Sequence, residues 1–203
     1  MTTPLRQLIL LLATTCAAAL ATAEAVGAQD LHPSRRPSPI GIARTLLGDT
    51  YVKVTYGRPY VRDRTIFGAP NDSSPPLVPY GRIWRTGANE ATEITATGPI
   101  LVAGEPLPAG TYSIFTEPGP RRWRIHFSPQ LGLDGTGLLT PDGFTADVYD
   151  PAQDVLVVEA PSSTLDEDVD QLTIELRPSP AGADLVLRWE TTEVSVPLAV
   201  PAG

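Results

Sequence analysis

The chain has 203 residues, a formal net charge of −8 at pH 7, 22 prolines, 17 glycines, two histidines and one cysteine. This length suits a single domain, and the acidic balance argues against nucleic acid or an anionic membrane surface as partner, because both require a large positive patch. The only thiol is Cys16, near the N-terminus, so the rest of the chain can form neither a disulfide nor a cysteine-based metal site.

The first 28 residues have the pattern of a secretory signal peptide. Arg6 precedes an apolar run over residues 8–21, and the small residues at 26–28 fit the rule for signal peptidase. An apolar core of about 14 residues is shorter than the roughly 20 that a membrane helix needs. The residues before Cys16 make a poor lipoprotein signal, which disfavours a lipid anchor there. We therefore expect a secreted or periplasmic protein, cleaved after Ala28, with no integral membrane segment in the mature chain.

Residues 29–44 predict an extended leader. Its density of prolines excludes a helix, and His32 within it is expected to be solvated. From residue 45 onward short apolar runs alternate with turn residues, so residues 45–200 are predicted to form one β-sandwich domain.

Alternating polarity places the strands of this domain. Val52, Val54 and Tyr56 share one predicted face, and in a later segment Trp123 shares a face with Phe127. The predicted strands cover residues 51–56, 91–96, 99–102, 111–116, 121–128, 154–159, 171–176, 183–190 and 193–198. About eight or nine short strands of this kind predict an all-β fold, an antiparallel, jelly-roll-like β-sandwich of two packed sheets.

Three connections stand out between these strands. Residues 57–81 form a proline-rich connection of unusual length, which is expected to cover or build a site. Residues 130–144 are rich in glycine but lack the lysine and following helix of a phosphate-binding loop. Residues 162–170 include Asp166, Glu167, Asp168 and Asp170 and are predicted to be a solvated loop, because the spacing of a calcium-binding loop is missing.

The sequence contains few groups for catalysis. His126 is the only histidine outside the leader; it lies among arginines with no orienting carboxylate nearby in the sequence, so we expect a surface or groove histidine rather than a catalytic one. One histidine without cysteines cannot assemble a zinc site. No metal and no cofactor are predicted.

Residues 78–95 hold the densest group of side chains able to bind a ligand. Together with residues of the long connection they define the candidate ligand-binding cluster, which consists of Arg58, Arg64, Trp84, Arg85, Asn89 and Glu90. We consider three interpretations: a non-catalytic module that binds a small polar or anionic ligand, a hydrolase with Glu90 as acid or base and Arg85 stabilising charge, and an Arg85–Glu90 ion pair that only locks the turn at residues 86–89.

Four motifs resemble a known family. They are YGRP at residues 56–59, RTIFG at 64–68, LVPYGRIWRTGANEAT at 77–92 and LPAGTYSIFT at 107–116. In this order they are similar to the bacterial domain-of-unknown-function family DUF2911, over roughly residues 36–198. The resemblance implies a secreted or envelope protein with no assigned activity. Residues 70–76 lengthen the loop before Val78 relative to this pattern.

Overall fold

The computed structural model describes residues 36–70, 73–140 and 143–202. The predicted signal peptide with Cys16, the cleavage site after Ala28 and residues 29–35 of the leader lie outside these ranges. In the part of the chain that is described, no helix is both long enough and apolar enough to span a bilayer.

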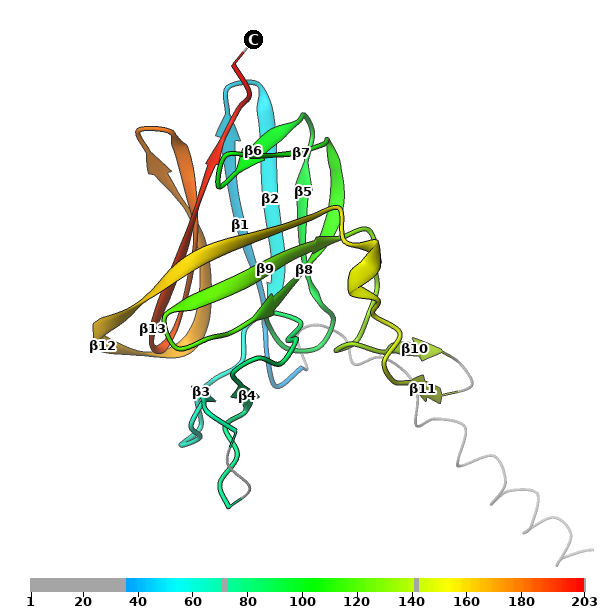
Figure 1. The fold of residues 1–203 in the computed structure, drawn as a ribbon, viewed down its shortest axis with the longest axis vertical. Coiled ribbons are helices and arrows are strands. Elements are labelled where there is room, and N and C mark those ends of the chain that lie inside the picture. Colours follow the sequence, from blue (N-terminus) through cyan, green and yellow to red (C-terminus); the bar gives the residue numbers. More distant parts are fainter. Residues whose placement is uncertain (1–35, 71–72, 141–142, 203) are drawn as a thin grey trace, which may run out of the picture. The chain divides into compact units, whose positions relative to one another are not determined.

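The described chain is built from strands, which confirms the predicted all-β fold (Figure 1). In chain order they are β1 (Ile40–Leu47), β2 (Thr50–Gly57), β3 (Phe67–Gly68), β4 (Val78–Pro79), β5 (Thr92–Ala96), β6 (Ile100–Val102), β7 (Glu105–Leu107), β8 (Gly110–Glu117), β9 (Arg122–Ser128), β10 (Leu138–Thr140), β11 (Gly143–Thr145), β12 (Leu156–Ser179) and β13 (Gly182–Ala199). A single 3-10 turn, Pro151–Gln153, precedes β12.

Nine of these strands form one antiparallel sheet, in the order β1-β2-β5-β8-β9-β12-β13-β6-β7. The predicted hairpin between β8 and β9 is present, with Ser113 opposite Ser128. In Figure 1, β1, β2 and β5 run along the long axis, while β9 and β12 cross them obliquely. The two packed layers that the sequence predicted are thus two halves of one continuous sheet, which changes direction between them.

Strand β12 makes this change of direction. Its first residues, 156–161, pair with β9, and its remaining residues pair with β13 as far as Ser179. Its register against β13 shifts twice, between Thr164 and Val169 and between Val169 and Thr173. Such irregularities bend a strand and increase its twist, which lets one strand serve both halves of the sheet.

The two halves of the sheet enclose one hydrophobic core. Val52 and Val54 of β2 and Trp123 of β9 are buried in it, as their alternation predicted, together with Leu187 and Trp189 of β13. The polar residues between them face outward. A second, smaller cluster forms on the outer face of the β8–β9 hairpin; it consists of Ala91, Phe115 and Leu133, with Ile83 and Tyr149 packed against it.

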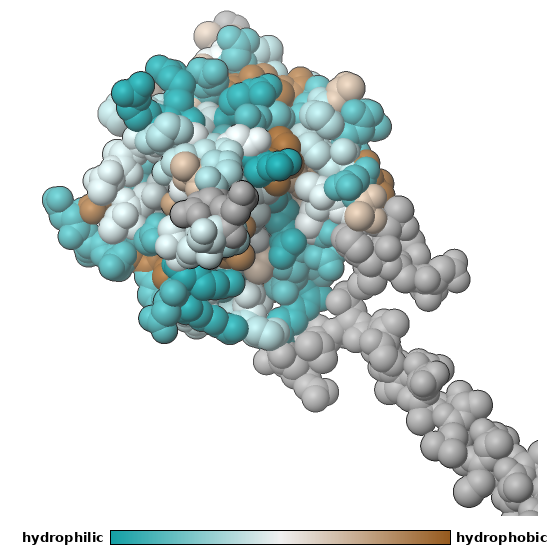
Figure 2. Space-filling view, turned by 60° about the horizontal axis from the view of Figure 1, so that its bottom comes forward, coloured by the Kyte–Doolittle hydropathy of each residue, from teal (hydrophilic) through white to brown (hydrophobic). Residues whose placement is uncertain are grey.

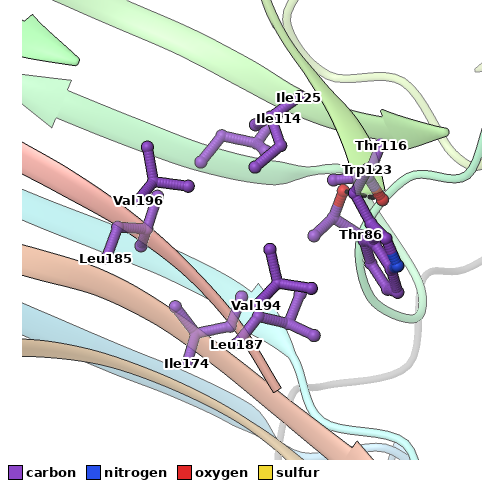
Figure 3. Close-up of a pocket in the computed structure, with 10 residues that line it drawn as sticks. All are labelled: Thr86, Ile114, Thr116, Trp123, Ile125, Ile174, Leu185, Leu187, Val194 and Val196. Carbon is purple, nitrogen blue, oxygen red and sulfur yellow. Dashed lines mark hydrogen bonds between the residues drawn. The ribbon is translucent and has the colours of Figure 1, made fainter. Parts of the chain in front are cut away.

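A small cavity of about 20 Å³ lies inside the core (Figure 3). Its walls come from both halves of the sheet, with Ile114 on one side and Leu185 on the other. At one end the hydroxyls of Thr86 and Thr116 bond to each other at 3.2 Å. Because this space is barely one water in size and nearly all its walls are apolar, it is a packing void and not a ligand site.

The residues at the end of β2 cover the edge of β12. The Tyr56 hydroxyl donates to the Ile174 carbonyl at 3.1 Å and accepts from the Ile174 N–H at 2.8 Å. Arg58 donates from Nε to the Leu172 carbonyl at 3.2 Å and from Nη2 to Thr173 Oγ1 at 3.2 Å. These bonds satisfy backbone groups that an open strand edge would otherwise leave without partners.

Replacing Tyr56 with phenylalanine is expected to lower the free energy of unfolding by about 1–3 kcal/mol, because the N–H and carbonyl of buried Ile174 both lose this partner. Urea denaturation measures the change. Tyr51→Phe on the same strand is the control, since the Tyr51 side chain is only half-buried and its hydroxyl has no hydrogen bond within the described chain. Equal stability of both variants would contradict a bridging role for the Tyr56 hydroxyl.

Several segments differ from the sequence-based expectation. Residues 40–44, predicted to belong to the extended leader, form the first half of β1. The predicted loop at 162–170 is the middle of β12, so the strands predicted at 154–159 and 171–176 are one strand. The strands predicted at 183–190 and 193–198 are likewise one strand, β13. Short strand pairs, β3–β4 and β10–β11, lie in the predicted connections 57–81 and 130–144.

Candidate functional site

Residues 84–92 form a turn at the end of β8 that positions most of the candidate cluster. Trp84 and Thr116 exchange two backbone hydrogen bonds of 2.8 Å, which fix the entry to the turn. The Thr92 N–H then donates to the Arg85 carbonyl at 3.0 Å and closes it. Thr86 and Asn89 have φ values of +58° and +64°, in the left-handed region. We call residues 84–92 the site turn.

Side chains hold the site turn from within. Thr92 Oγ1 donates to the Thr86 carbonyl at 2.8 Å, and Trp84 Nε1 donates to the Gly87 carbonyl at 3.1 Å. Gly57, the last residue of β2, packs directly against Ala88: a Cβ atom added at Gly57 would lie 1.9 Å from the Ala88 carbonyl oxygen. The turn is therefore fixed by neutral hydrogen bonds and close backbone packing.

An aromatic cluster supports this end of the core. Trp84 stacks on Trp189 with ring centroids 5.7 Å apart and an interplanar angle of 18°. Phe67 of β3 packs edge-on against Trp84, Trp123 and Trp189, with centroid distances of 4.8–5.9 Å. Offset and edge-on contacts of this kind are the favoured geometries of aromatic pairs. The long connection after β2 thus inserts Phe67 among three indoles.

A cavity of about 260 Å³ lies beside this cluster, and we call it the arginine cavity. Its lining residues are Ser38, Pro59, Tyr60, Arg62, Arg64, Leu77, Val78, Trp84, Arg85, Gly87, Ala88 and Trp189. Three of them are arginines and none is acidic. Figure 2 looks at this end of the molecule and shows a mainly hydrophilic surface with small, separated hydrophobic patches. The cavity therefore presents positive charge beside apolar walls.

Arg85 is the least satisfied cation of this cavity. Its Nε atom is buried and has no hydrogen-bond partner among the described residues. Asp134 pairs through its backbone with Glu90, and this brings Gly135 next to Arg85, whose Nη1 lies 3.0 Å from the position a Gly135 Cβ would take. A buried donor without a partner is unfavourable, so an acceptor supplied by a ligand would stabilise it.

Arg64 is more exposed and is anchored by its own loop. Its Nε donates to the Val61 carbonyl at 2.9 Å and its Nη2 to the Tyr60 carbonyl at 2.7 Å. Neighbouring Arg62 donates from Nη2 to the Pro37 carbonyl at 3.4 Å. These contacts are all with neutral carbonyls, so the positive charges of both arginines stay uncompensated there.

The structure separates the predicted cluster into two groups. Arg64, Trp84 and Arg85 line the arginine cavity, whereas the other three do not. Arg58 is bound to the edge of β12, as described above. The Asn89 side-chain amide donates to the Ser38 carbonyl at 3.1 Å. Glu90 accepts from Arg36 Nη1 at 2.6 Å, and its side chain is 47% exposed.

Glu90 therefore pairs with Arg36 and not with Arg85, to which it makes no hydrogen bond. Burial raises the pKa of Glu90, but the hydrogen bond and charge of Arg36, with the charge of Arg85, hold the pKa below its ordinary value. Glu90 is thus a carboxylate at neutral pH. The predicted Arg85–Glu90 ion pair is therefore not formed. The site turn is held instead by hydrogen bonds between neutral groups.

The sequence-based expectation for His126 was wrong. His126 is 2% exposed, and its Nδ1 lies 2.8 Å from Asp154 Oδ2, which also accepts from the Tyr149 hydroxyl at 2.8 Å. Burial and then the hydrogen bond to Asp154 raise the pKa of Tyr149 well above its ordinary range. The ring nitrogen Nε2 of His126 is buried and has no partner in the described ranges, and the residue lines none of the three cavities.

Two features hid this network from sequence reasoning. Arg122 and Arg124 made the outer face of β9 look solvent-exposed, whereas Tyr149 and Asp154 lie against its second half, where His126 is buried. Asp154 is 28 residues from His126, with no motif linking them. Among the described residues, no group of three or more histidine, cysteine or acidic side chains is arranged to hold a metal ion.

These features define a β-sheet protein with an arginine-lined cavity at one end of its core. The chain belongs to the family described as "Protein of unknown function (DUF2911)", whose model matches residues 38–198, as the four sequence motifs indicated. No curated protein and no solved structure matches the chain.

Proposed function

We propose that this protein is a secreted or envelope binding module without catalytic activity, which holds a small anionic ligand in the arginine cavity. The observation that carries the proposal is Arg85. Its buried Nε–H has no partner among the described residues, and the residue is one of three arginines in the lining of a cavity that has no carboxylate in that lining. A carboxylate or phosphate group would supply the missing acceptor and the missing negative charge.

The walls of the cavity define the rest of the ligand. Beside the arginines they include Leu77, Val78 and the indoles of Trp84 and Trp189. At about 260 Å³ the space is slightly below the roughly 300–1,000 Å³ of sites for drug-sized ligands. The ligand class is therefore a small carboxylate or phosphate with a compact apolar body, and a planar aromatic acid fits this description.

The proposed compartment rests on the N-terminal pattern. Residues 1–28 have the charged start, short apolar run and small-residue cleavage site of an exported protein. A ligand-binding role outside the cytoplasm is consistent with that pattern, and cleavage after Ala28 would leave a chain without cysteine.

The hydrolytic alternative is less well supported. Glu90 is paired with Arg36, lies outside the arginine cavity and has a lowered pKa, so it cannot donate a proton at neutral pH and is a weak base. The purely structural alternative required an ion pair that Arg85 does not make. Neither alternative accounts for the unpartnered Nε–H of Arg85.

We expect benzoate and phenyl phosphate to bind the protein, and the variant Arg85→Met to weaken that binding by at least about tenfold, which corresponds to one lost charge-assisted hydrogen bond. Isothermal titration calorimetry measures both affinities. Benzamide and benzyl alcohol, which are neutral and of similar size, test whether charge is required. Inorganic phosphate and acetate test whether the apolar body contributes.

Arg82→Met is the matched control, because Arg82 lies three residues from Arg85, is exposed and does not line the cavity. It should leave the affinity for benzoate unchanged. Arg85→Met should retain its melting temperature, since it removes an unsatisfied donor and keeps an apolar side chain. Binding by neither anion, equal binding by Arg85→Met, or a large loss of stability in that variant would each reject the proposal.

A further inference from the structure

A second cavity, of about 200 Å³, opens where β12 and β13 cross the turn between β8 and β9, and we call it the Glu190 cavity. Its lining residues are Phe67, Tyr80, Gly119, Pro120, Trp123, Ser162, Ser163, Thr164, Glu190, Thr191 and Thr192. Five of these residues are serines or threonines, Tyr80 adds a sixth hydroxyl, one residue carries a carboxylate, and none is a lysine or arginine. Its chemistry is thus opposite in charge to that of the arginine cavity.

Glu190 is held in this cavity by an unusual backbone conformation. Its φ value is +53°, in the left-handed region that glutamate rarely adopts, at the point where the β12–β13 register shifts around Val169. The backbone of Ile66 lies close enough to the Glu190 carboxyl group to act on its pKa. The register shift thus sets the place of Glu190 on β13, and the segment leading into β3 lies beside its side chain.

The negative charge of Glu190 has no counterion in the described chain. Arg188, two residues earlier on β13, is engaged with Glu175 at 3.2 Å and Glu167 at 3.8 Å. Asp168 adds a second negative charge close by. Burial first, and then the charge of Asp168, raise the pKa of Glu190 above its ordinary value, against the opposing effect of the Ile66 backbone. A cation bound beside Glu190 would offset both the cost of burying the carboxylate and its repulsion from Asp168.

We propose that the Glu190 cavity binds a small hydroxylated amine, with the ligand's ammonium group paired to Glu190 and its hydroxyls facing the serine and threonine residues of the lining. The rings of Phe67, Tyr80 and Trp123 also line this space, and aromatic rings attract organic cations. An anionic ligand is disfavoured, because the lining supplies no positive charge.

The two cavities share the aromatic cluster as a common wall. Phe67 and Trp123 line the Glu190 cavity, Trp84 and Trp189 line the arginine cavity, and the four rings are in contact. Trp189 and Glu190 are consecutive on β13, yet they line different cavities. The ammonium site therefore stands independently of the anion site and can be tested without it.

The test uses three sugars of one size and different charge: glucosamine, glucose and gluconate. In ¹⁵N-labelled protein we expect glucosamine to shift the backbone amide resonances of Glu190, Thr191 and Thr192 and to bind roughly tenfold more tightly than glucose. Gluconate should leave these resonances unchanged. If it enters the arginine cavity it shifts those of Gly87 and Ala88 instead, so the two sites are distinguished in one spectrum.

The variant Glu190→Gln should bind glucosamine and glucose equally weakly. Glu159→Gln is the control, since Glu159 lies on the outer side of β12 in an exposed pair with Arg122 at 3.5 Å, and it should keep the preference for glucosamine. Equal binding of glucose by the unaltered protein would make this a neutral polyol site and overturn the proposal. So would shifts of residues 190–192 by gluconate, no shift with any of the three sugars, or an undiminished preference in Glu190→Gln.

Discussion

The variant Gly57→Ala is expected to lose about 3 kcal/mol or more of the free energy of unfolding and to lose anion binding with it. The new Cβ would lie 1.9 Å from the Ala88 carbonyl oxygen and 2.7 Å from the Ala88 carbonyl carbon, both of which are backbone atoms. No rotamer change can relieve this overlap, so β2 and the site turn must move apart, and overpacking that forces backbone shifts is strongly destabilising. Because Gly87 and Ala88 line the arginine cavity, its shape changes too.

Urea denaturation and benzoate titration measure the two effects. Gly68→Ala is the matched control, because the nearest atoms to its added Cβ, those of the Pro76 side chain, lie at an ordinary 3.6 Å. We expect the control to change stability by less than about 0.5 kcal/mol. A folded Gly57→Ala protein with unaltered stability would show that β2 does not pack against the site turn as described.

The variant Asp154→Ala is expected to lose about 3–5 kcal/mol of stability. Asp154 accepts hydrogen bonds from both His126 Nδ1 and the Tyr149 hydroxyl, and the side chains of His126 and Asp154 are only 3% and 2% exposed. Its removal leaves two buried polar groups without a partner, each worth about 1–3 kcal/mol, together with a cavity. Through Tyr149, which packs against the outer cluster, these contacts connect that cluster to His126 of β9.

Two further variants separate hydrogen bonding from packing in this network. Tyr149→Phe removes one hydrogen bond and should lose only about 1 kcal/mol. Asp154→Asn keeps an oxygen acceptor and the side-chain volume, so its loss should be smaller than that of Asp154→Ala. The double variant Asp154→Ala with Tyr149→Phe should be less destabilised than the sum of the single variants, because the tyrosine then has no hydroxyl left to satisfy. Additive losses would argue against a shared network.

The strands that the sequence predicted best are those with one face in the core. In β2, and in β9 as far as Ile125, buried residues alternate with polar ones, and the pattern predicted both strands and their inward faces. In β1 the pattern is inverted at the edge of the sheet, since Ile42 and Leu46 are 64% and 66% exposed. The middle of β12, residues 162–170, is mostly polar and has only Leu165 and Val169 as apolar residues. Its strand conformation comes from pairing with β13 rather than from its own composition.

The candidate site was predictable in part. The clustering of Arg64, Trp84 and Arg85 followed from their place in one unusually polar, glycine-containing stretch and the long connection before it. The hydrogen-bond partners of the other three residues could not be predicted. Arg58 binds β12, Asn89 binds Ser38 and Glu90 binds Arg36. No local sequence pattern encodes pairing over such distances along the chain. Asp154 as partner of His126 was missed for the same reason.

The hydrogen bond between the Tyr56 hydroxyl and the Ile174 carbonyl joins residues 118 positions apart and connects β2 to β12. A chain being synthesised cannot make this contact until Ile174 has emerged. Topologies dominated by such distant pairings fold slowly, in milliseconds to seconds. Strand β5 can pair with β2 early, but Tyr56 and Arg58 at the end of the β1–β2 hairpin must wait for β12 before their side chains find these partners.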